Sequence, residues 1–438
     1  MKDNDKEMIE ELYEVYIYAF PLIVLDLHMK ALTNTETPTS EKAPLNQYIH
    51  AKGVAGAKDK GIVHPNMDTV YSKAHMNLKE EPLYIHKPAS DRYTAIELID
   101  AYGNCVAIIG NGGIGEEHEV DAVLTGPNYN GAVPEELVRI DVPTNLCWTL
   151  TRILKDVNDE EEIARIQKGF DIRPLSAYQK EYVYPKGNYI PEHDFIPYEK
   201  LGELSIGEFF TIFNHLIGDN LGKDPDMRIL ENAKKYGIGA GETFSLSSFP
   251  ADVQAELEHF YERAVKEFHY KTKNHLYSNV RDNWILTNPE LANFKKNYSL
   301  RAKVAWGGFG ANPVDVAIYP QAYVDAEGNI LSGQYQYICH FDSLPPVKEF
   351  WSLTAYGEDQ FLIPNEINRN GINDRSSITI NEDGSLDLYL QKDRPSKEKI
   401  SNWLPVADDT FGLVLRLYSP DHTILDGTWK MPRIIRCS

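Results

Sequence analysis

The segment His64-Pro-Asn-Met-Asp-Thr-Val-Tyr71 gathers polar side chains inside an otherwise apolar stretch. Asp68 has a carboxylate that could carry a substrate proton, and Asn66 could donate a hydrogen bond to a developing oxyanion. His64 opens the segment and is the third catalytic candidate. The alternative is structural, because Asn66 and Asp68 can form Asx turns and Thr69 can cap the strand that follows.

Two arginines in the last third of the chain could bind an anionic group. Arg416 stands in the apolar segment 413–418, and a buried guanidinium there needs an anion, because burying it unpaired costs several kcal/mol. Asp374 is one candidate partner and a ligand carboxylate is another, with an ion pair inside the protein favoured. Arg375 follows in a predicted loop, from which it could clamp a ligand carboxylate through two hydrogen bonds.

Large aromatic side chains are frequent in the same region, at Trp351, Tyr356, Trp403 and Trp429. Packing in the core or at sheet corners explains most of them. One or two could instead form a stacking platform for a sugar or an apolar ligand, and Trp351 and Tyr356 are the candidates for substrate binding. His340 lies beside Cys339 on a predicted strand, and we interpret it as a structural residue.

Several chemistries lack the spacing that they need. The chain has no Gly-x-Ser-x-Gly elbow, no Walker A lysine and no His-Glu-x-x-His, since His118-Glu119 is not followed by a second histidine. The glycine-rich residues 237–241 follow a predicted helix, whereas a phosphate-binding loop should follow a strand. The thirteen histidines form no short pairs, so we predict no metal site, although a metal held by residues distant in the sequence stays open, and no motif identifies a cofactor.

Composition limits the classes of partner. A chain of 438 residues usually forms about two or three domains. Its net charge of −21 argues against a nucleic acid, which would require a dense basic surface. The four cysteines, Cys105, Cys147, Cys339 and Cys437, are scattered, and we predict buried free thiols while a disulfide stays open. A small molecule is the expected ligand, and a homo-oligomer is compatible with the sequence.

No apolar run reaches the roughly 18 residues of a membrane span. The nearest, residues 15–25, ends at Asp26 and follows an acidic segment rather than the basic start of a signal peptide. We therefore predict an amphipathic helix over residues 6–30, kinked at Pro21. As written, the chain is predicted to be cytoplasmic, or periplasmic if an export signal preceded residue 1.

The elements that must position these side chains change type along the chain. Short β-branched runs separated by turn residues predict an antiparallel sandwich, with strands at residues 93–99, 105–109, 122–125 and 137–142. Helical patterns follow at residues 159–170, 206–218 behind a Ser205/Glu208 capping box, 227–236 behind Asp224-Pro225, and 251–277. Strands return with a hairpin of residues 377–380 and 386–390, a second hairpin across 322–330, and a central strand at 411–418.

Long motifs in order resemble a known family. Tyr18-Ala-Phe-Pro21 and Pro65-Asn-Met-Asp-Thr-Val-Tyr71 are similar to the bacterial "domain of unknown function 1254". Phe350-Trp-Ser-Leu-Thr-Ala-Tyr356, Asp374-Arg375, Asn402-Trp-Leu-Pro405 and Leu425-Asp-Gly-Thr-Trp429 resemble its companion, "domain of unknown function 1214". The usual Pro-Asn-Asn-Asp is Pro-Asn-Met-Asp here, which weakens any role of the third position at Met67.

The resemblance covers nearly the whole chain and implies a mixed, mainly β architecture. It implies an N-terminal immunoglobulin-like β-sandwich, a helical middle layer and a C-terminal jelly-roll-like β-sandwich, and no established activity. With the periodicity it predicts an N-terminal helical segment at residues 1–42, packed on the middle helices. A β-sandwich domain at 43–155, a helical domain at 156–300 and the jelly-roll-like domain at 301–438 follow.

Three functions are compatible with these observations. The first is an enzyme that holds a small polar or anionic substrate in a cleft between the two β domains, with Asp68 as acid or base, Asn66 as polariser, and Arg375 or Arg416 on the anionic group. It requires Asn66, Asp68 and Arg375 to lie within about 10 Å of a common pocket. The second is a carbohydrate- or small-ligand-binding protein without catalysis, which predicts exposed indoles, and the third is a scaffold or assembly protein.

Overall fold

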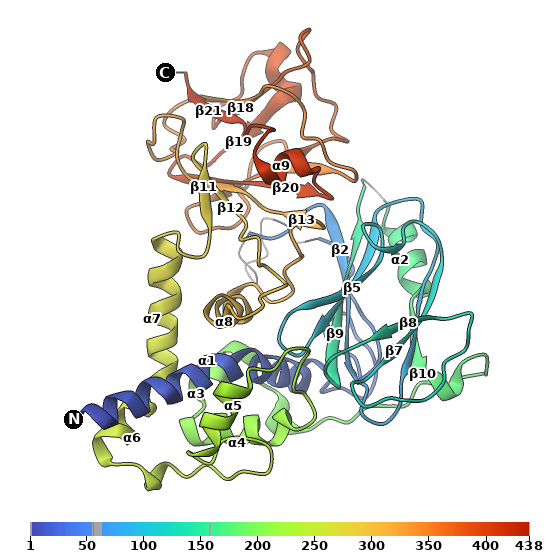
Figure 1. Cartoon of the computed structure of the whole chain (residues 1–438). Helices are drawn as coiled ribbons and strands as arrows, with labels where there is room; N and C mark the ends of the chain where they lie inside the picture. Colours follow the sequence, from blue (N-terminus) through green and yellow to red (C-terminus); the bar gives the residue numbers. More distant parts are fainter. Residues whose placement is uncertain (1, 55, 57–63, 157–158, 438) are drawn as a thin grey trace. The chain divides into compact units, whose positions relative to one another are not determined.

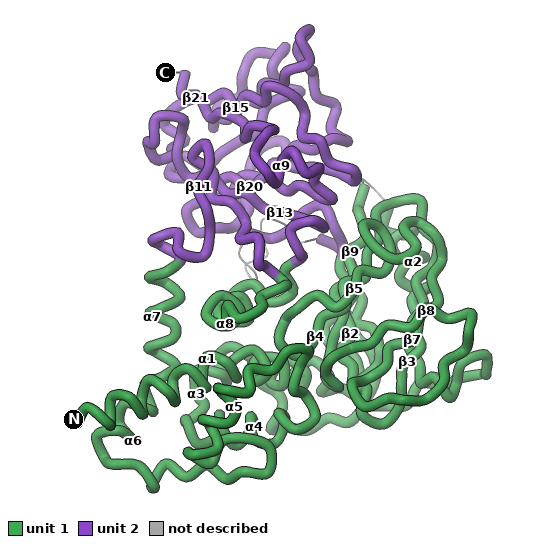
Figure 2. Tube along the Cα trace, viewed as in Figure 1, with its two compact units in different colours: residues 1–52, 71–271, 292–311 green, residues 53–70, 272–291, 312–438 purple. Residues whose placement is uncertain are grey.

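The computed structural model describes residues 2–54, 56, 64–156 and 159–437, which form two compact units (Figure 2). Unit 1 contains Met1–Lys52, Tyr71–Lys271 and Ala292–Ala311, and unit 2 contains Gly53–Val70, Thr272–Leu291 and Asn312–Ser438. Each unit is therefore assembled from separate stretches of the chain. Helix makes up 28% and strand 25% of the structure, the predicted combination of β-sheets and a helical middle.

The β part of unit 1 consists of two sheets (Figure 1). Most neighbouring strands are antiparallel, as the turn signals predicted, and the parallel pairs are β5–β6 and β7–β8. The six-stranded sheet has the order β1 (Ile49–His50), β2 (Thr69–Asn77), β9 (Leu146–Leu154), β4 (Thr94–Asp100), β5 (Cys105–Gly110) and β6 (Ile114–Gly115). The four-stranded sheet has the order β10 (Asp171–Pro174), β3 (Leu83–Lys87), β7 (Val120–Thr125) and β8 (Val138–Asp141).

Helix α1 (Asp3–Leu32) is the centre of the helical part of unit 1 (Figure 1). It packs against five of the helices whose bounds follow, and the Tyr16 ring stacks on Phe209 with centroids 4.2 Å apart. The α-helices that follow α1 are α2 (Glu160–Gly169), α3 (Pro197–Glu203), α4 (Ile206–Ile217), α5 (Met227–Lys234), α6 (Ala251–Leu257), α7 (Phe260–Lys273) and α8 (Tyr298–Gly307). Short 3₁₀ helices are η1 (Leu175–Ala177), η2 (Pro191–His193) and η3 (Leu246–Ser248).

The predicted amphipathic character of α1 is wrong. From Leu12 to Leu27 every position except Glu14 is buried, because other helices cover all sides of α1. Pro21 lies inside the helix, as predicted. α1 has the length and apolar composition of a membrane-spanning or signal helix, but 83% of its most apolar window is buried within the protein. Burial of this extent is typical of a core helix.

Helix boundaries follow the capping signals in part. The capping box of Ser205 and Glu208 is present at the start of α4, as predicted. Helix α5 is capped by Asp226, which accepts from the backbone N–H groups of Arg228 and Ile229, rather than by Asp224. The single helix predicted over residues 251–277 is two helices, α6 and α7, interrupted after Leu257.

Unit 2 contains two further sheets around a large apolar core. The seven-stranded sheet has the order β11 (Asn279–Arg281), β12 (Trp284–Leu286), β14 (Gln321–Ala322), β20 (Phe411–Tyr418), β16 (Trp351–Gly357) and β17 (Gly371–Asn373), with β13 (Ala317–Ile318) also on β20. The four-stranded sheet has the order β19 (Trp403–Pro405), β18 (Leu386–Gln391), β15 (Tyr337–Phe341) and β21 (Arg433–Arg436). η4 (Lys397–Asn402) and α9 (His422–Asp426) complete the elements of the unit. Strand β20 is buried at every position, as predicted for a central strand.

One predicted hairpin is wrong. Residues 377–380 do not form a strand with β18. The side-chain amide of Asn402 instead donates to the carbonyl of Thr379 and accepts from its N–H, so it takes the place of a neighbouring strand. The second predicted hairpin is reduced to β14 and an isolated bridge between Val324 and Ile330.

Candidate functional site

Asp68, Ser352 and Arg375 lie together in unit 2. The Ser352 hydroxyl donates to Asp68 Oδ2 at 2.5 Å, and Arg375 Nη2 lies 3.6 Å from Asp68 Oδ1. Asp68 is 4% exposed, and its carboxylate is therefore almost shielded from water. Asp68 and Arg375, two of the three residues that the enzyme hypothesis places near a common pocket, therefore lie close together, and Asp68, the predicted proton carrier, is buried.

The strand register explains how this group forms. On β16, Trp351, Leu353 and Ala355 belong to the apolar core, so Ser352, Thr354 and Tyr356 lie on the other face of the sheet. On β20 the same alternation assigns Val414, Arg416 and Tyr418 to that face, and Ser352 is directly opposite Arg416. Residues 64–68 contact these polar side chains.

Arg416 binds the backbone of this segment. Its Nη2 donates to Tyr356 Oη at 2.7 Å, to the carbonyl of His64 at 3.0 Å and to that of Pro65 at 3.4 Å. Its Nη1 donates to Thr354 Oγ1 at 3.0 Å. Burial lowers the pKa of Arg416, but the nearby Tyr356 and Asp68 outweigh burial and raise it overall. Arg416 therefore holds residues 64 and 65 against β16. Asp374, which the sequence offered as a partner of Arg416, instead accepts a hydrogen bond from Arg375.

Asn66 and His64 are held in the same segment. The Asn66 side-chain amide donates to Tyr418 Oη at 2.9 Å, and its carbonyl accepts from the N–H of Asp68 at 2.8 Å, which is the predicted Asx turn. His64 has a φ of 48° and its ring lies 4.9 Å from that of Tyr356. Burial, with the charge of Arg416, lowers the pKa of His64 to about 4, so the ring is neutral at pH 7.

Arg375 and Asp374 form the accessible edge of the group. Arg375 Nη1 donates to Asp374 Oδ1 at 2.7 Å, and the guanidinium lies 5.1 Å from the centre of the Phe350 ring. The side chains of Arg375 and Asp374 are 23% and 32% exposed. Burial raises the pKa of Asp374, the Arg375 charge opposes this rise, and the Asp68 charge adds to it. A carboxylate with a raised pKa beside an arginine can exchange protons with a bound anion.

The predicted aromatic platform is not formed. Trp351, Trp403 and Trp429 are all buried, at 3%, 1% and 9% exposure, and Tyr356 is fully buried. The indole N–H of Trp403 donates to the carbonyl of Gln391, and that of Trp429 to the carbonyl of Ser343. These rings belong to the core or its margin, so they offer no shelf for a sugar.

Two cavities of unit 2 lie away from this group. One, of about 540 Å³, is lined by Asp342, Arg433 and Lys430 among others, and a second, of about 320 Å³, shares Asp342 and Lys430 with it. His340, which the sequence suggested was structural, lies between the carboxylates of Asp387 and Asp342, at 2.6 and 3.2 Å. Asp68, Arg375 and Arg416 are not among the described residues that line either cavity.

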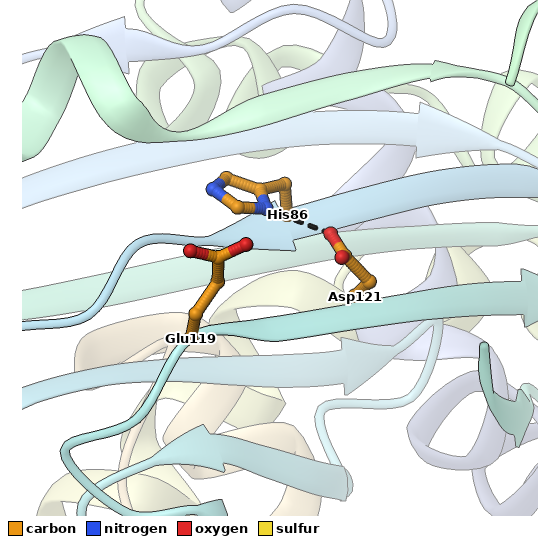
Figure 3. A group of neighbouring side chains, drawn as sticks. All are labelled: His86, Glu119 and Asp121. Atoms are coloured by element: carbon orange, nitrogen blue, oxygen red, sulfur yellow. Dashed lines mark hydrogen bonds and ion pairs between the residues drawn. The ribbon is translucent and has the colours of Figure 1, made fainter. Parts of the chain in front are cut away.

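Unit 1 contains a group that can hold a metal ion (Figure 3). His86 on β3, Glu119 before β7 and Asp121 on β7 offer ligand atoms that lie within 4.8 Å of one another. His86 and Asp121 are direct cross-strand partners, and His86 Nδ1 lies 2.8 Å from Asp121 Oδ1, which also accepts from Tyr84. The search for short histidine pairs missed this group, because His86 lies on β3 whereas Glu119 and Asp121 lie just before and on β7.

Family models match both halves of the chain. Residues 45–174 match DUF1254 and residues 316–422 match DUF1214, each described as a protein of unknown function. The chain belongs to the family that combines these two domains. In this DUF1254–DUF1214 protein, the site draws on both matched regions, because residues 64–68 come from the first and Ser352, Arg375 and Arg416 from the second.

A solved structure has the same fold as this chain. The VPA0106 protein from Vibrio parahaemolyticus matches with a TM-score of 0.72 and 20% identity over 98% of this chain and 100% of that chain, which shows a common fold. An uncharacterised protein from Burkholderia cenocepacia gives a TM-score of 0.47 at 11% identity, over 96% of this chain and 86% of that one. No curated protein matches the chain.

Proposed function

We propose that this DUF1254–DUF1214 protein is an enzyme that acts on a small polar or anionic molecule bound at Arg375. The observation that carries the proposal is the partly exposed Arg375 guanidinium, held between Asp374 and the buried Asp68. A guanidinium that its neighbours hold in place loses little conformational entropy when it binds a carboxylate or phosphate.

Asp374 is the group that exchanges a proton with the substrate. It touches Arg375, its side chain is one-third exposed, and its raised pKa brings its protonated form closer to neutral pH. Two neighbouring carboxylates with different environments can divide the tasks of proton donor and charge stabiliser between them. Asp68, buried and bonded to Ser352, stabilises charge by holding Arg375 in position.

Asn66, His64 and Arg416 position the segment that carries Asp68. Arg416 binds the two carbonyls that precede Asn66, and Asn66 bonds to Tyr418 and to the N–H of Asp68. Because these contacts are buried or partly buried and lie within the protein, we assign these side chains a positioning role and give the substrate contacts to Asp374 and Arg375.

A purified-protein assay with a mixture of small polar metabolites tests this function, with consumption and product formation followed by mass spectrometry. We expect a compound that the native protein consumes and that Arg375→Met and Asp374→Asn leave unchanged. Arg394→Met is the matched control, since Arg394 is an exposed arginine of the same unit paired with Glu366. Turnover that persists in both site variants would overturn the proposal.

A second candidate is ligand binding without catalysis at the 540 Å³ cavity, whose volume is in the range of small-molecule sites. A thermal-shift screen of the same metabolites distinguishes binding at this cavity from binding at Arg375. A ligand at the cavity loses its effect in Lys430→Met and Arg433→Met and keeps it in Arg375→Met, since binding to the native state raises the melting temperature.

A further inference from the structure

Three basic side chains of unit 1 influence one another electrostatically, at a place that the proposed function does not use. Lys73 and His75 are two residues apart on β2 and therefore point to the same face of the sheet, and His28 belongs to α1. Burial lowers the pKa of His28 to about 4 and that of His75 well below its usual value, and the charge of Lys73 adds to both shifts. His28 also lowers the pKa of His75, so each pair interacts.

Aromatic rings connect the two imidazoles. The Trp148 indole on β9 stacks on the His75 ring, with centroids 5.9 Å apart and planes 8° from parallel. The other neighbour of Trp148 is Phe309, stacked at 4.8 Å, and the Phe309 ring lies 5.5 Å from that of His28. Tyr198 contacts His28 from another element, at 5.0 Å. The two imidazoles are therefore set in a largely aromatic wall.

Polar nitrogen atoms in this wall have no hydrogen-bond partner among the residues that the structure describes. They are His28 Nε2, His75 Nδ1 and Trp148 Nε1, and His75 and Trp148 are only 3% and 4% exposed. Lys73 is mostly buried, and the described residues supply it with no hydrogen bond or ion pair. Burial lowers the pKa of Lys73, and the charge of Glu41 partly opposes this decrease. Buried polar groups in native proteins are nearly always satisfied, so a cluster of unsatisfied groups indicates a missing partner.

The chemistry of these groups defines that partner. An indole N–H and a lysine ammonium only donate hydrogen bonds, and neither is a usual metal ligand. The missing group must therefore accept hydrogen bonds, and several bases in a low-dielectric wall favour a negative charge on it. We infer that His28, Lys73, His75 and Trp148 form a binding site for a small oxyanion group, a carboxylate or a phosphate.

Thermal unfolding of the full chain in sodium acetate or sodium phosphate tests this site, with sodium chloride at equal ionic strength as reference. We expect a saturable rise in melting temperature with at least one of the two oxyanions. A rise with acetate alone assigns a carboxylate, a rise with phosphate alone assigns a phosphate, and a rise with both supports a general oxyanion site.

Variants locate the effect. Lys73→Met and His75→Gln should each weaken anion binding about tenfold, a loss of about 1.4 kcal/mol. Without anion, Lys73→Met should melt at the same or a higher temperature, because it removes an unpaired buried cation, so a lost anion response in this variant is not a folding defect. Lys79→Met, which affects a surface ion pair with Asp219, and His50→Gln, whose ring bonds to Ser72, are the controls.

Two results would overturn the inference. One is the absence of any oxyanion effect beyond that of chloride, which would leave water as the partner of these nitrogen atoms. The other is an oxyanion effect that both Lys73→Met and His75→Gln retain in full. These two results are independent of the activity proposed at Arg375, because Arg375 belongs to unit 2 and the anion site belongs to unit 1.

Discussion

Ser352 Oγ lies 2.5 Å from Asp68 Oδ2, although 284 positions separate the two residues in the chain. Ser352 is one of the polar residues that alternate with core residues on β16, and Asp68 precedes β2. The hydroxyl and the nearby Arg375 guanidinium compensate a carboxylate that is almost fully buried. This pair therefore connects the segment before β2 to the sheet of unit 2.

Asp68→Asn should destabilise unit 2. The change removes the charge that faces Arg375 and weakens the bond from Ser352, and we expect the free energy of unfolding to fall by about 2–4 kcal/mol. Urea unfolding followed by tryptophan fluorescence measures this, because Trp284, Trp351, Trp403 and Trp429 are in unit 2. Asp383→Asn, at an exposed turn, should change the midpoint little, and equal effects of the two variants would contradict the interpretation.

Arg416→Met should be at least as costly. It leaves the carbonyl of His64 and the hydroxyl of Thr354 without this donor, while the carbonyl of Pro65 keeps the hydrogen bond from Tyr356 Oη, and we expect a loss of about 2–4 kcal/mol. The same urea titration applies, with Arg394→Met as an exposed control expected within about 0.5 kcal/mol of the native protein. A stability unchanged by Arg416→Met would show that water replaces the guanidinium.

Acid should destabilise the protein through neutral, partly buried histidines. Burial lowers the pKa of His50 to about 4, and burial with the Arg416 charge does the same for His64. A base with a lowered folded pKa contributes stability that is present above its unfolded pKa of about 6.5 and is lost as pH falls toward 4.

Melting temperatures recorded between pH 7 and pH 4 measure this dependence. His50→Gln should reduce the slope, since glutamine does not titrate in this range. The exposed His118→Gln is the control and should leave the slope unchanged. If His50→Gln and the native protein lose stability in parallel, His50 is not one of the groups responsible.

Binding of an oxyanion at the His28 site should be stronger at lower pH. A bound anion raises the pKa of His28 from about 4 toward its usual 6.5, so binding takes up a proton between these values. We expect affinity about tenfold weaker at pH 7.5 than at pH 5.5. The other titratable groups near the site are Lys73, His75, Glu41 and Tyr198.

Calorimetric titration with acetate at the two pH values measures this change, because acetate stays largely ionised in this range. Proton uptake, detected as a dependence of the heat on the buffer, should accompany binding at pH 5.5. His28→Gln should weaken the pH dependence more than it weakens binding at pH 7.5. Equal affinities at both pH values would exclude His28 as the proton acceptor.

Local signals in the sequence identified elements where local energetics dominate. The capping box of Ser205 and Glu208 starts α4, and the apolar run of residues 411–418 is the buried central strand β20. Such signals failed where a distant side chain competes, as Asn402 does for the backbone of Thr379. They also failed for α1, whose burial on all sides depends on helices far along the chain.

The site follows the same division. Asp68, Asn66 and Arg375 could be selected as candidates from their residue types and sequence surroundings. The alternation of Ser352, Thr354 and Tyr356 with apolar residues is a sequence pattern that indicates a polar face on this strand. The sequence did not predict the hydrogen-bond partners of these side chains. Arg416 donates to backbone carbonyls rather than to Asp374, and Asp374 accepts from Arg375. Nothing in the local sequence around His28, His75 and Trp148 indicated that their side-chain nitrogen atoms would be buried without hydrogen-bond partners. Chain-local forces choose helix, strand and turn, whereas burial and charge pairing depend on which distant segments meet, and only the folded chain decides that.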